Sequence, residues 1–93
     1  MEMFVTIIEQ RDLQSRTYTN QKGENAVFHS RGFVLSNGID EFYAEMVGEA
    51  ALLCPAYDCS VLHRLQGNIR QRRFTDKNGT DRFENIIYIQ KLV

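Results

Sequence analysis

Turns that contain glycine divide this chain into short segments rich in β-branched and aromatic residues, and this division constrains its fold most. The turn signals are Lys22-Gly23, Asn37-Gly38 and Lys77-Asn78-Gly79. Asn-Gly is a strong signal of a type I′ hairpin turn, in which both central residues need a positive φ. Helical periodicity is nearly absent between the turns, whereas the composition favours strands. The sequence therefore predicts strands over residues 3–9, 26–35, 41–48, 60–74 and 81–92.

One short helical connection interrupts these strands. Residues 49–53 have the composition of one or two helical turns, and Pro55 ends them. Five strands, two hairpins and a helical connection between the third and fourth strands predict an all-β, five-stranded Greek-key barrel of the OB-fold type. A chain of 93 residues is long enough for one domain only, so we expect residues 1–93 to form a single barrel.

The net charge of −1 hides an uneven distribution of charged residues. Residues 1–60 carry four basic and nine acidic side chains, whereas residues 61–93 carry seven basic and three acidic ones. Such an asymmetry indicates a polyanionic partner for the basic segment. A solvated charged surface without any partner explains the same distribution, and charge alone favours that simpler explanation.

Alternation along residues 60–74 gives this strand two different faces. One face is mostly apolar and is expected to point into the core, with Gly67 at a close approach or bend: Val61, His63, Leu65, Gly67 and Ile69. The other face carries a row of arginines that ends in an aromatic ring: Leu62, Arg64, Gln66, Asn68, Arg70, Arg72 and Phe74. Arginine binds phosphate and a flat ring stacks on a base, so this row favours single-stranded nucleic acid. The alternative is an exposed arginine-rich strand whose Phe74 packs into the end of the barrel.

The strand predicted over residues 81–92 is apolar on both faces. Ile87 and Ile89 alternate with Ile86 and Tyr88. We expect the core to cover one face and a partner subunit or a loop to cover the other. A homodimer or homotetramer is therefore expected.

Two sequence stretches resemble the bacterial single-stranded-DNA-binding protein family. Residues 67–83, GNIRQRRFTDKNGTDRF, are similar to the fourth strand, hairpin and fifth strand of that family. Residues 16–20, RTYTN, followed by Gly23 and Ala26-Val27, resemble its first hairpin. The resemblance implies an OB-fold that binds single-stranded DNA without sequence preference in replication, recombination or repair.

The resemblance and the alternation together give a set of expected site residues. The resemblance implies that Phe74 stacks on a base, that Arg70 and Arg72 contact the backbone, and that Lys77 and Arg82 flank the bound strand. On residues 26–35 we assign the face with Arg31 to the ligand, because a buried unpaired arginine is costly. On residues 41–48 the opposite choice would bury Glu45, so Phe42, Ala44 and Met46 are expected in the core. The full expected site is Arg31, Phe33, Tyr43, Arg64, Asn68, Arg70, Arg72, Phe74, Lys77 and Arg82.

The chain also departs from that family. It has no tryptophan, Glu45 lies on the expected ligand face, and the sequence ends at Val93 without the acidic tail that recruits replication and repair enzymes. We therefore expect a bare binding domain, which also resembles primosomal replication protein N. A primosome-type adaptor, in which protein contacts dominate over DNA binding, is the alternative function, and RNA is an alternative ligand.

Neither catalysis nor a metal site is expected. Cys54 and Cys59 do not form a C-x-x-C pair, and only His29 and His63 could join them as zinc ligands. Asp76 and Asp81 flank a turn, which explains both of them. We expect reduced thiols, no cofactor, no signal peptide and no membrane segment, and hence a cytoplasmic protein whose partners are single-stranded DNA and replication proteins. Binding is expected to weaken steeply as salt rises.

Overall fold

The computed structural model describes all 93 residues, and its regular secondary structure consists of six strands and one short helix. In chain order the elements are β1 (Glu2–Gln10), β2 (Gln14–Thr19), β3 (Asn25–Ser36), β4 (Glu41–Val47), α1 (Glu49–Leu53), β5 (His63–Thr75) and β6 (Asp81–Leu92). The predicted all-β class and the short helix after the third predicted strand are confirmed. The strand β2 is not among the five predicted strands, although the resemblance of residues 16–20 to the first hairpin of the family implied a strand there. The helix has only five residues, and no helix in the chain is long and apolar enough to cross a membrane.

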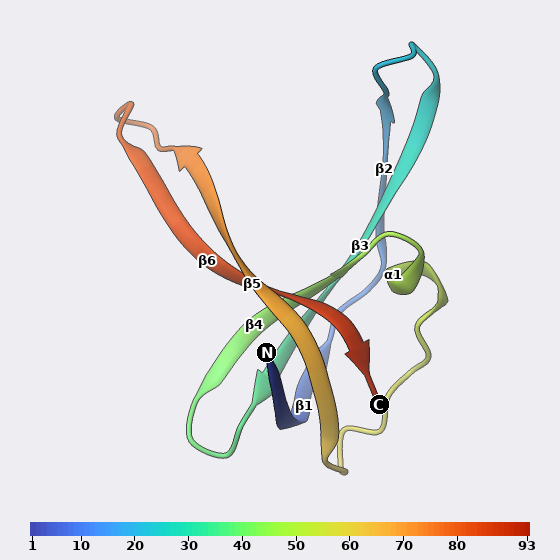
Figure 1. Cartoon of the computed structure of the whole chain (residues 1–93), viewed down its shortest axis with the longest axis vertical. Coiled ribbons are helices and arrows are strands. Elements are labelled where there is room, and N and C mark those ends of the chain that lie inside the picture. Colours follow the sequence, from blue (N-terminus) through green and yellow to red (C-terminus); the bar gives the residue numbers. More distant parts are fainter.

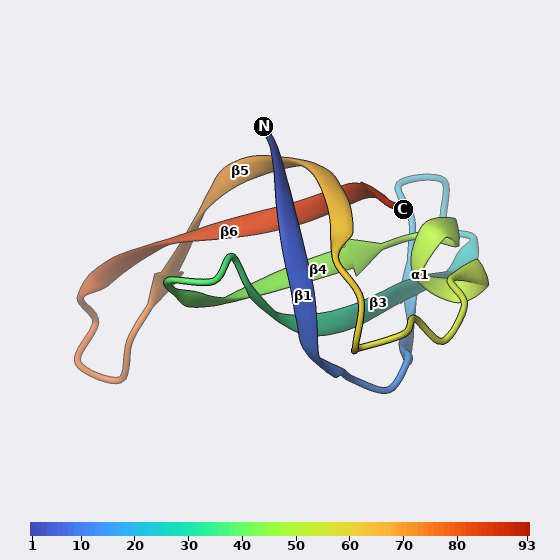
Figure 2. The same cartoon turned by 90° about the horizontal axis from the view of Figure 1, so that it is seen from below.

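Five strands close into a barrel. Hydrogen-bonded neighbours follow the order β1-β5-β6-β4-β3, and β3 pairs back with β1 to complete the circle. All of these pairs are antiparallel except β4 with β6, which is parallel over a short stretch. In Figure 2, β1 runs across the direction of β3, β4 and β6. Outside the circle, β2 pairs with β3 alone and extends the sheet.

Alternate residues of the barrel strands form the core. The buried cluster contains Val5, Ile7, Phe33, Leu35, Ala44, Met46, Ala51, Leu65, Ile89 and Leu92. The predicted core faces of β4 and of the first half of β5 are confirmed, because Ala44, Met46, His63 and Leu65 are buried. Val61 and Ile69 were also predicted in the core but are exposed, since Val61 precedes β5 and Ile69 lies where β5 has left the barrel.

The ligand-facing assignment of Phe33 is wrong. Its side chain is 0% exposed and lies in the core cluster beside Leu35. Arg31 points to the same side of β3 but lies nearer the end of the barrel, where its Nη1 donates to the carbonyl oxygen of Arg11 at 3.2 Å. The cost of burying an arginine therefore did not identify the ligand-facing side of β3. Two residues on the same side of a strand can differ, with one in the core and the next beyond the end of the barrel.

Gly67 lies where β5 bends across β6. A Cβ atom at this position would lie 2.5 Å from the carbonyl oxygen of Tyr88. The pairing of β5 with β6 shifts between Gln66 and Gly67, which marks a bulge, and the Gly67 amide donates to the carbonyl oxygen of Met1 at 3.0 Å. The predicted close approach at this glycine is confirmed.

The Gln10 side chain makes two hydrogen bonds to the long loop between α1 and β5. Gln10 Nε2 donates to the carbonyl oxygen of Pro55 at 2.9 Å, and its Oε1 accepts the amide of Tyr57 at 3.0 Å. The Tyr57 ring then packs edge-on against Phe33 and His63, with ring centroids 6.1 and 5.5 Å away. The side chain of Gln10 thus hydrogen-bonds to the backbone of the loop as a neighbouring strand would. Tyr57 then packs the loop against the core at Phe33.

Two hairpins extend beyond the barrel as arms. Figure 1 shows the hairpin of β2 and β3 and the hairpin of β5 and β6 leaving the barrel and diverging from each other. Their turns contain Gly23 and Gly79, with φ of 77° and 76°, as the turn signals predicted. The third predicted turn, at Asn37-Gly38, also joins two paired strands, but it is not of type I′ because only Gly38 has a positive φ.

The close approach at Gly67 yields a stability prediction. Gly67→Ala forces backbone or strand movement, because the new methyl group meets a carbonyl oxygen of β6 and not a flexible side chain. We expect the free energy of unfolding to fall by about 1–3 kcal/mol in denaturant titrations. Gln71→Ala, at an exposed position of the same strand, is the control and should change stability by less than about 0.5 kcal/mol. Equal effects of the two substitutions would contradict the role of Gly67.

Candidate nucleic-acid interface

The side chains that point outward from β3, β4, β5 and β6 between the two arms form a continuous surface, which we call the outer face. Strand register places Gly32 opposite Glu45, Glu45 opposite Tyr88, and Tyr88 opposite Asn68. A Cβ atom at Gly32 would lie 2.6 Å from the Tyr43 hydroxyl oxygen, so the absence of a side chain at Gly32 makes room for the Tyr43 ring. The outer face thus has an aromatic ring lying across neighbouring strands.

Three arginines stack on aromatic rings of this part of the molecule. The guanidinium carbon lies 5.4 Å from the ring centroid for Arg11 on Tyr43, 5.7 Å for Arg16 on Phe28, and 5.5 Å for Arg70 on Tyr88. Such pairs combine a cation with flat surfaces on which bases can stack. Neither Arg16 nor Arg70 forms an ion pair with a carboxylate, whereas Arg11 lies 3.5 Å from Glu9.

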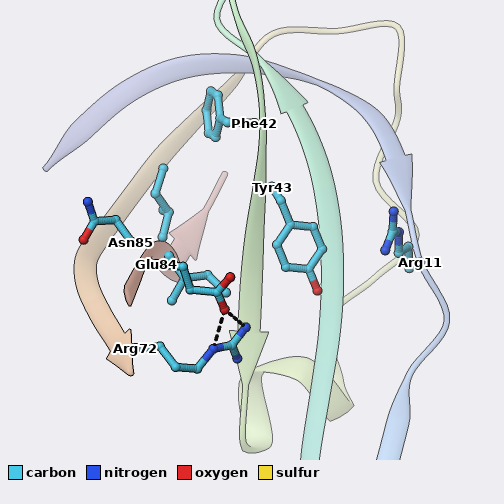
Figure 3. Close-up of a pocket in the computed structure, with 8 residues that line it drawn as sticks. Arg11, Phe42, Tyr43, Arg72, Glu84 and Asn85 are labelled. Carbon is cyan, nitrogen blue, oxygen red and sulfur yellow. Dashed lines mark hydrogen bonds and ion pairs between the residues drawn. The ribbon is translucent and has the colours of Figure 1, made fainter. Parts of the chain in front are cut away.

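Arg72 lies between two carboxylates on the outer face. Its Nε donates to Glu84 Oε1 at 2.7 Å, a second guanidinium nitrogen contacts the same oxygen, and Nη1 lies 3.9 Å from Glu45 Oε1. Figure 3 shows the Arg72–Glu84 pair on one side of β4 and the Tyr43 ring on the other. The hydrogen bond that Arg72 donates to Glu84 raises the pKa of Arg72 above its usual value. The charge of Arg72 is therefore largely compensated within the protein.

The Tyr43 hydroxyl belongs to the same network. It donates to Glu45 Oε1 at 3.2 Å. Burial raises the pKa of Tyr43, and the adjacent Glu45 carboxylate raises it further. Tyr43 therefore stays a neutral hydrogen-bond donor at physiological pH and fixes one oxygen of Glu45.

Most other arginines of the basic segment also have acidic partners. Arg73 pairs with Asp81 at 3.0 Å and Arg82 with Asp76 at 2.9 Å, both on the arm of β5 and β6. Arg64 donates to Glu2 of β1 at 2.6 Å. The hydrogen bonds donated by Arg82 and Arg64 lower the pKa values of Asp76 and Glu2, respectively. Only Arg70, Lys77 and Lys91 of the basic segment have no carboxylate within ion-pair distance.

The structure brings together part of the predicted site. Tyr43, Asn68, Arg70 and Arg72 lie on the outer face, where Asn68 and Arg70 line a pocket of about 540 Å³ with Phe28 and Tyr88. Phe74, Lys77 and Arg82 lie toward the tip of the arm, with Phe74 46% exposed and paired opposite Arg82. Three predicted residues lie elsewhere: Phe33 in the core, Arg31 at the end of the barrel and Arg64 beside β1.

Five residues of this surface were missing from the prediction: Arg11, Arg16, Phe28, Glu84 and Tyr88. Arg16 belongs to the stretch that resembles the first hairpin of the family, and a hairpin register fixed by the turn at Asn78-Gly79 would have placed Glu84 opposite Arg72. No local pattern indicates that Phe28 and Tyr88 share a pocket, because β3 and β6 are far apart in sequence.

Comparison of the sequence with protein-family models and with curated proteins finds no match. No three His, Cys, Asp or Glu side chains gather in a way that could hold a metal ion. Cys54 and Cys59 are free thiols. The geometry and charge of the outer face are therefore the basis for a functional proposal.

The turn at the tip of the β5–β6 arm yields a pH prediction. Asp76 accepts the amides of Asn78 and Thr80 at 2.9 and 3.0 Å and pairs with Arg82, which lowers its pKa below the ordinary 3.8. The order that this carboxylate gives to the turn should persist above about pH 3.8 and disappear as the pH falls through the lower native pKa. A carboxyl titration followed by NMR measures that pKa directly.

Two substitutions separate the causes of this shift. Arg82→Ala should move the pKa of Asp76 upward toward 3.8, because the hydrogen bond from Arg82 is the largest cause of the lowering. Lys77→Ala, within the same turn, should leave it unchanged. A pKa of Asp76 that is insensitive to Arg82→Ala would show that the ion pair does not form in solution.

Proposed function

We propose that this chain is an OB-fold domain that binds single-stranded DNA without a requirement for one fixed sequence, in replication, recombination or repair. It acts as a binding protein and not as an enzyme, as a homodimer or homotetramer in the cytoplasm, where its free thiols stay reduced. The observation that carries the proposal is the set of three arginine–aromatic stacks, two of which lie on the outer face between the arms.

The strand connections support the OB-fold assignment. An OB-fold is a five-stranded Greek-key barrel, and here β1, β5, β6, β4 and β3 close into a circle with α1 between β4 and β5. In this fold the surface of the second and third barrel strands binds oligonucleotides, together with the loop between the first and second strands and the loop between the fourth and fifth. Those barrel strands correspond to β3 and β4, and the flanking loops correspond to the tips of the two arms.

The bound strand is proposed to cross the outer face from one arm to the other. Its bases stack on Phe28, Tyr43 and Tyr88, and Arg16 and Arg70 meet its phosphates while covering two of these rings. Phe74 extends the stacking surface along the β5–β6 arm. Stacking suits sequence-tolerant binding because every base has a π-face.

The two exposed phenylalanines of the β5–β6 arm provide a matched pair for testing this path. Phe74 points to the same side as Arg70 and Arg72, whereas Phe83, opposite Arg73, points to the other side and is 58% exposed. Phe74→Ala should weaken oligo(dT) binding by about 1–3 kcal/mol in a fluorescence titration, and Phe83→Ala should leave it unchanged. A larger effect at Phe83 would place the DNA on the opposite side of the arm.

The ion pairs yield a salt prediction that differs from the one made on charge alone. Each neutralised phosphate of a single strand contributes roughly −0.7 to the slope of log K against log salt. Because Arg64, Arg72, Arg73 and Arg82 already have acidic partners, the unpaired cations on the proposed path are Arg16, Arg70 and Lys77, and these three give a slope of about −2. Titrations of dT oligomers of graded length at several salt concentrations measure it, and a slope steeper than about −5 would mean that these ion pairs open on binding.

The same ion pairs favour one alternative function. A surface whose arginines are compensated binds phosphate weakly, so a primosome-type adaptor, in which contacts to replication proteins dominate, fits this feature. The titration separates the two functions: oligo(dT) that fails to bind even at low salt excludes the DNA-binding proposal and leaves the adaptor. Comparison of dT with rU oligomers of equal length decides between DNA and RNA.

A further inference from the structure

We propose that two copies of this chain join through the free edge of β6, where residues 81–85 pair antiparallel with the same residues of the second copy about a two-fold axis at Phe83. The inference rests on the homo-oligomer of the proposed function and deepens it by naming the edge that joins the copies. The observations that carry it are an unpaired strand edge, the order of charged residues along that edge and one exposed aromatic ring.

One edge of β6 has no partner along the arm. β5 pairs with β6 on one side from Asp81 onward, whereas on the other side β4 pairs with β6 only at Ile87 and Tyr88. In Figure 1, β4 and the β5–β6 arm run apart from the place where they pair. The backbone groups of residues 81–86 that point away from β5 therefore have no partner in a neighbouring strand. Such an edge is a template for pairing with another chain.

The order of side chains along this edge selects one symmetric register. In an antiparallel pair of identical strands, the residue on the two-fold axis lies opposite its own copy, and like charges directly opposite each other are destabilising. An axis at Asn85 brings Phe83 opposite Ile87 of the second copy, whose edge β4 already occupies. Of the other positions, only Phe83 avoids two equal charges on the axis, because its neighbours are charged: Asp81, Arg82 and Glu84.

The register centred on Phe83 makes favourable contacts on both sides of the joined strands. Phe83, which is 58% exposed, lies opposite Phe83 of the second copy, and aromatic pairs across strands are stabilising. On the other side, Arg82 lies opposite Glu84 of the second copy, and the symmetry repeats this pair of opposite charges. Asp81 lies opposite Asn85 of the second copy, so no like charges face each other.

Arg82 and Glu84 have atoms left for these contacts. Arg82 uses Nε for its bond to Asp76, and Glu84 uses only Oε1 for its contacts to Arg72. Nη1 and Nη2 of Arg82 and Oε2 of Glu84 form no hydrogen bond within the chain. The side chains of Arg82 and Glu84 are 62% and 44% exposed. The two cross-strand pairs therefore form without opening an ion pair of the single chain.

The other free edges of the arms suit pairing less well. β2 has a free edge, but an axis at Thr17, near its middle, brings only hydroxyl side chains together on that face and gains no apolar contact there. β5 has one beyond Gly67, where the pairing with β1 has ended. That edge carries three arginines, which repel those of a second copy: Arg70, Arg72 and Arg73.

The pairing places the DNA surfaces of both arms on one side. A two-fold axis perpendicular to a sheet leaves each face of the sheet on its own side. Phe74 lies opposite Arg82 within the hairpin and therefore on the side away from Phe83. The joined arms form a four-stranded sheet in the order β5-β6-β6-β5, which carries Phe74 and Arg70 of both copies on one side. A DNA strand that is longer than one outer face then meets the arm of the second copy.

Sedimentation equilibrium without DNA tests the residue on the axis. Phe83→Asp puts two carboxylates on the axis, and the single chain accommodates the change because Arg73 lies opposite that position in the hairpin. We expect the parent chain to form dimers and the variant to have a dissociation constant at least about tenfold higher. Gln71→Asp adds the same charge at an exposed position of β5 and should dimerise like the parent. Equal unfolding midpoints of all three proteins confirm that the fold is intact.

Disulfide cross-linking tests the register. In a chain with Cys54→Ser and Cys59→Ser, Phe83→Cys should form a covalent dimer with oxidised glutathione. Directly opposite residues have Cα atoms about 4.5–5.5 Å apart, which a disulfide can span. Asp81→Cys and Asn85→Cys should each cross-link poorly alone and well when the two variants are mixed.

Each outcome decides between the proposals. A parent chain that stays monomeric at its highest soluble concentration overturns this inference, and oligo(dT) binding by that monomer leaves the DNA-binding function standing. Dimers that survive Phe83→Asp unchanged show that another surface joins the copies, which also overturns it. Cross-linking of Asp81→Cys with itself but not with Asn85→Cys contradicts the register. Dimers that pass these tests and bind no oligo(dT) confirm the pairing and overturn the DNA-binding function.

Discussion

Three strands of this protein are longer than the barrel that they help to build. β3, β5 and β6 have twelve or thirteen residues, and only part of each faces the core. The remaining length cannot pack against the barrel interior, so it pairs in two hairpin arms and exposes both of its faces. The outer face and its arginine–aromatic stacks lie where strands leave the barrel. The surface proposed to bind DNA is therefore a consequence of strand length.

The same constraint explains which parts of the fold could be predicted. Turn residues located the strands, since glycine with a positive φ is required at Gly23, Gly38 and Gly79. The core face of β4 followed from alternation, because the opposite choice would have buried Glu45. On β3 both faces contain apolar residues, and Arg31 indicated the wrong one. Alternation predicts the buried side of a strand whose two faces meet the core and the solvent. It does not predict burial where a strand continues past the end of the barrel, because both faces are then exposed.

The sequence predicted which arginines belong to the candidate site, but it did not predict which of them are paired with carboxylates. The row of Arg70, Arg72 and Phe74 is visible in the sequence, and the structure keeps it on one side of β5. The acidic partners come from other strands: Glu84 from β6 and Glu45 from β4. The first follows from the register of one hairpin, whereas the second depends on the parallel pairing of β4 with β6, which no local pattern encodes. Segment charge therefore overstated the number of free cations.

Carboxylates on a surface proposed to bind a polyanion need a physical reason. At the outer face they repel phosphate, and this costs affinity for the backbone. They also fix the guanidinium of Arg72 and the hydroxyl of Tyr43, so these groups lose less side-chain entropy when a ligand arrives. On the proposed function, the compensated arginines attract the DNA backbone less strongly, and the exposed aromatic rings supply contact with the bases.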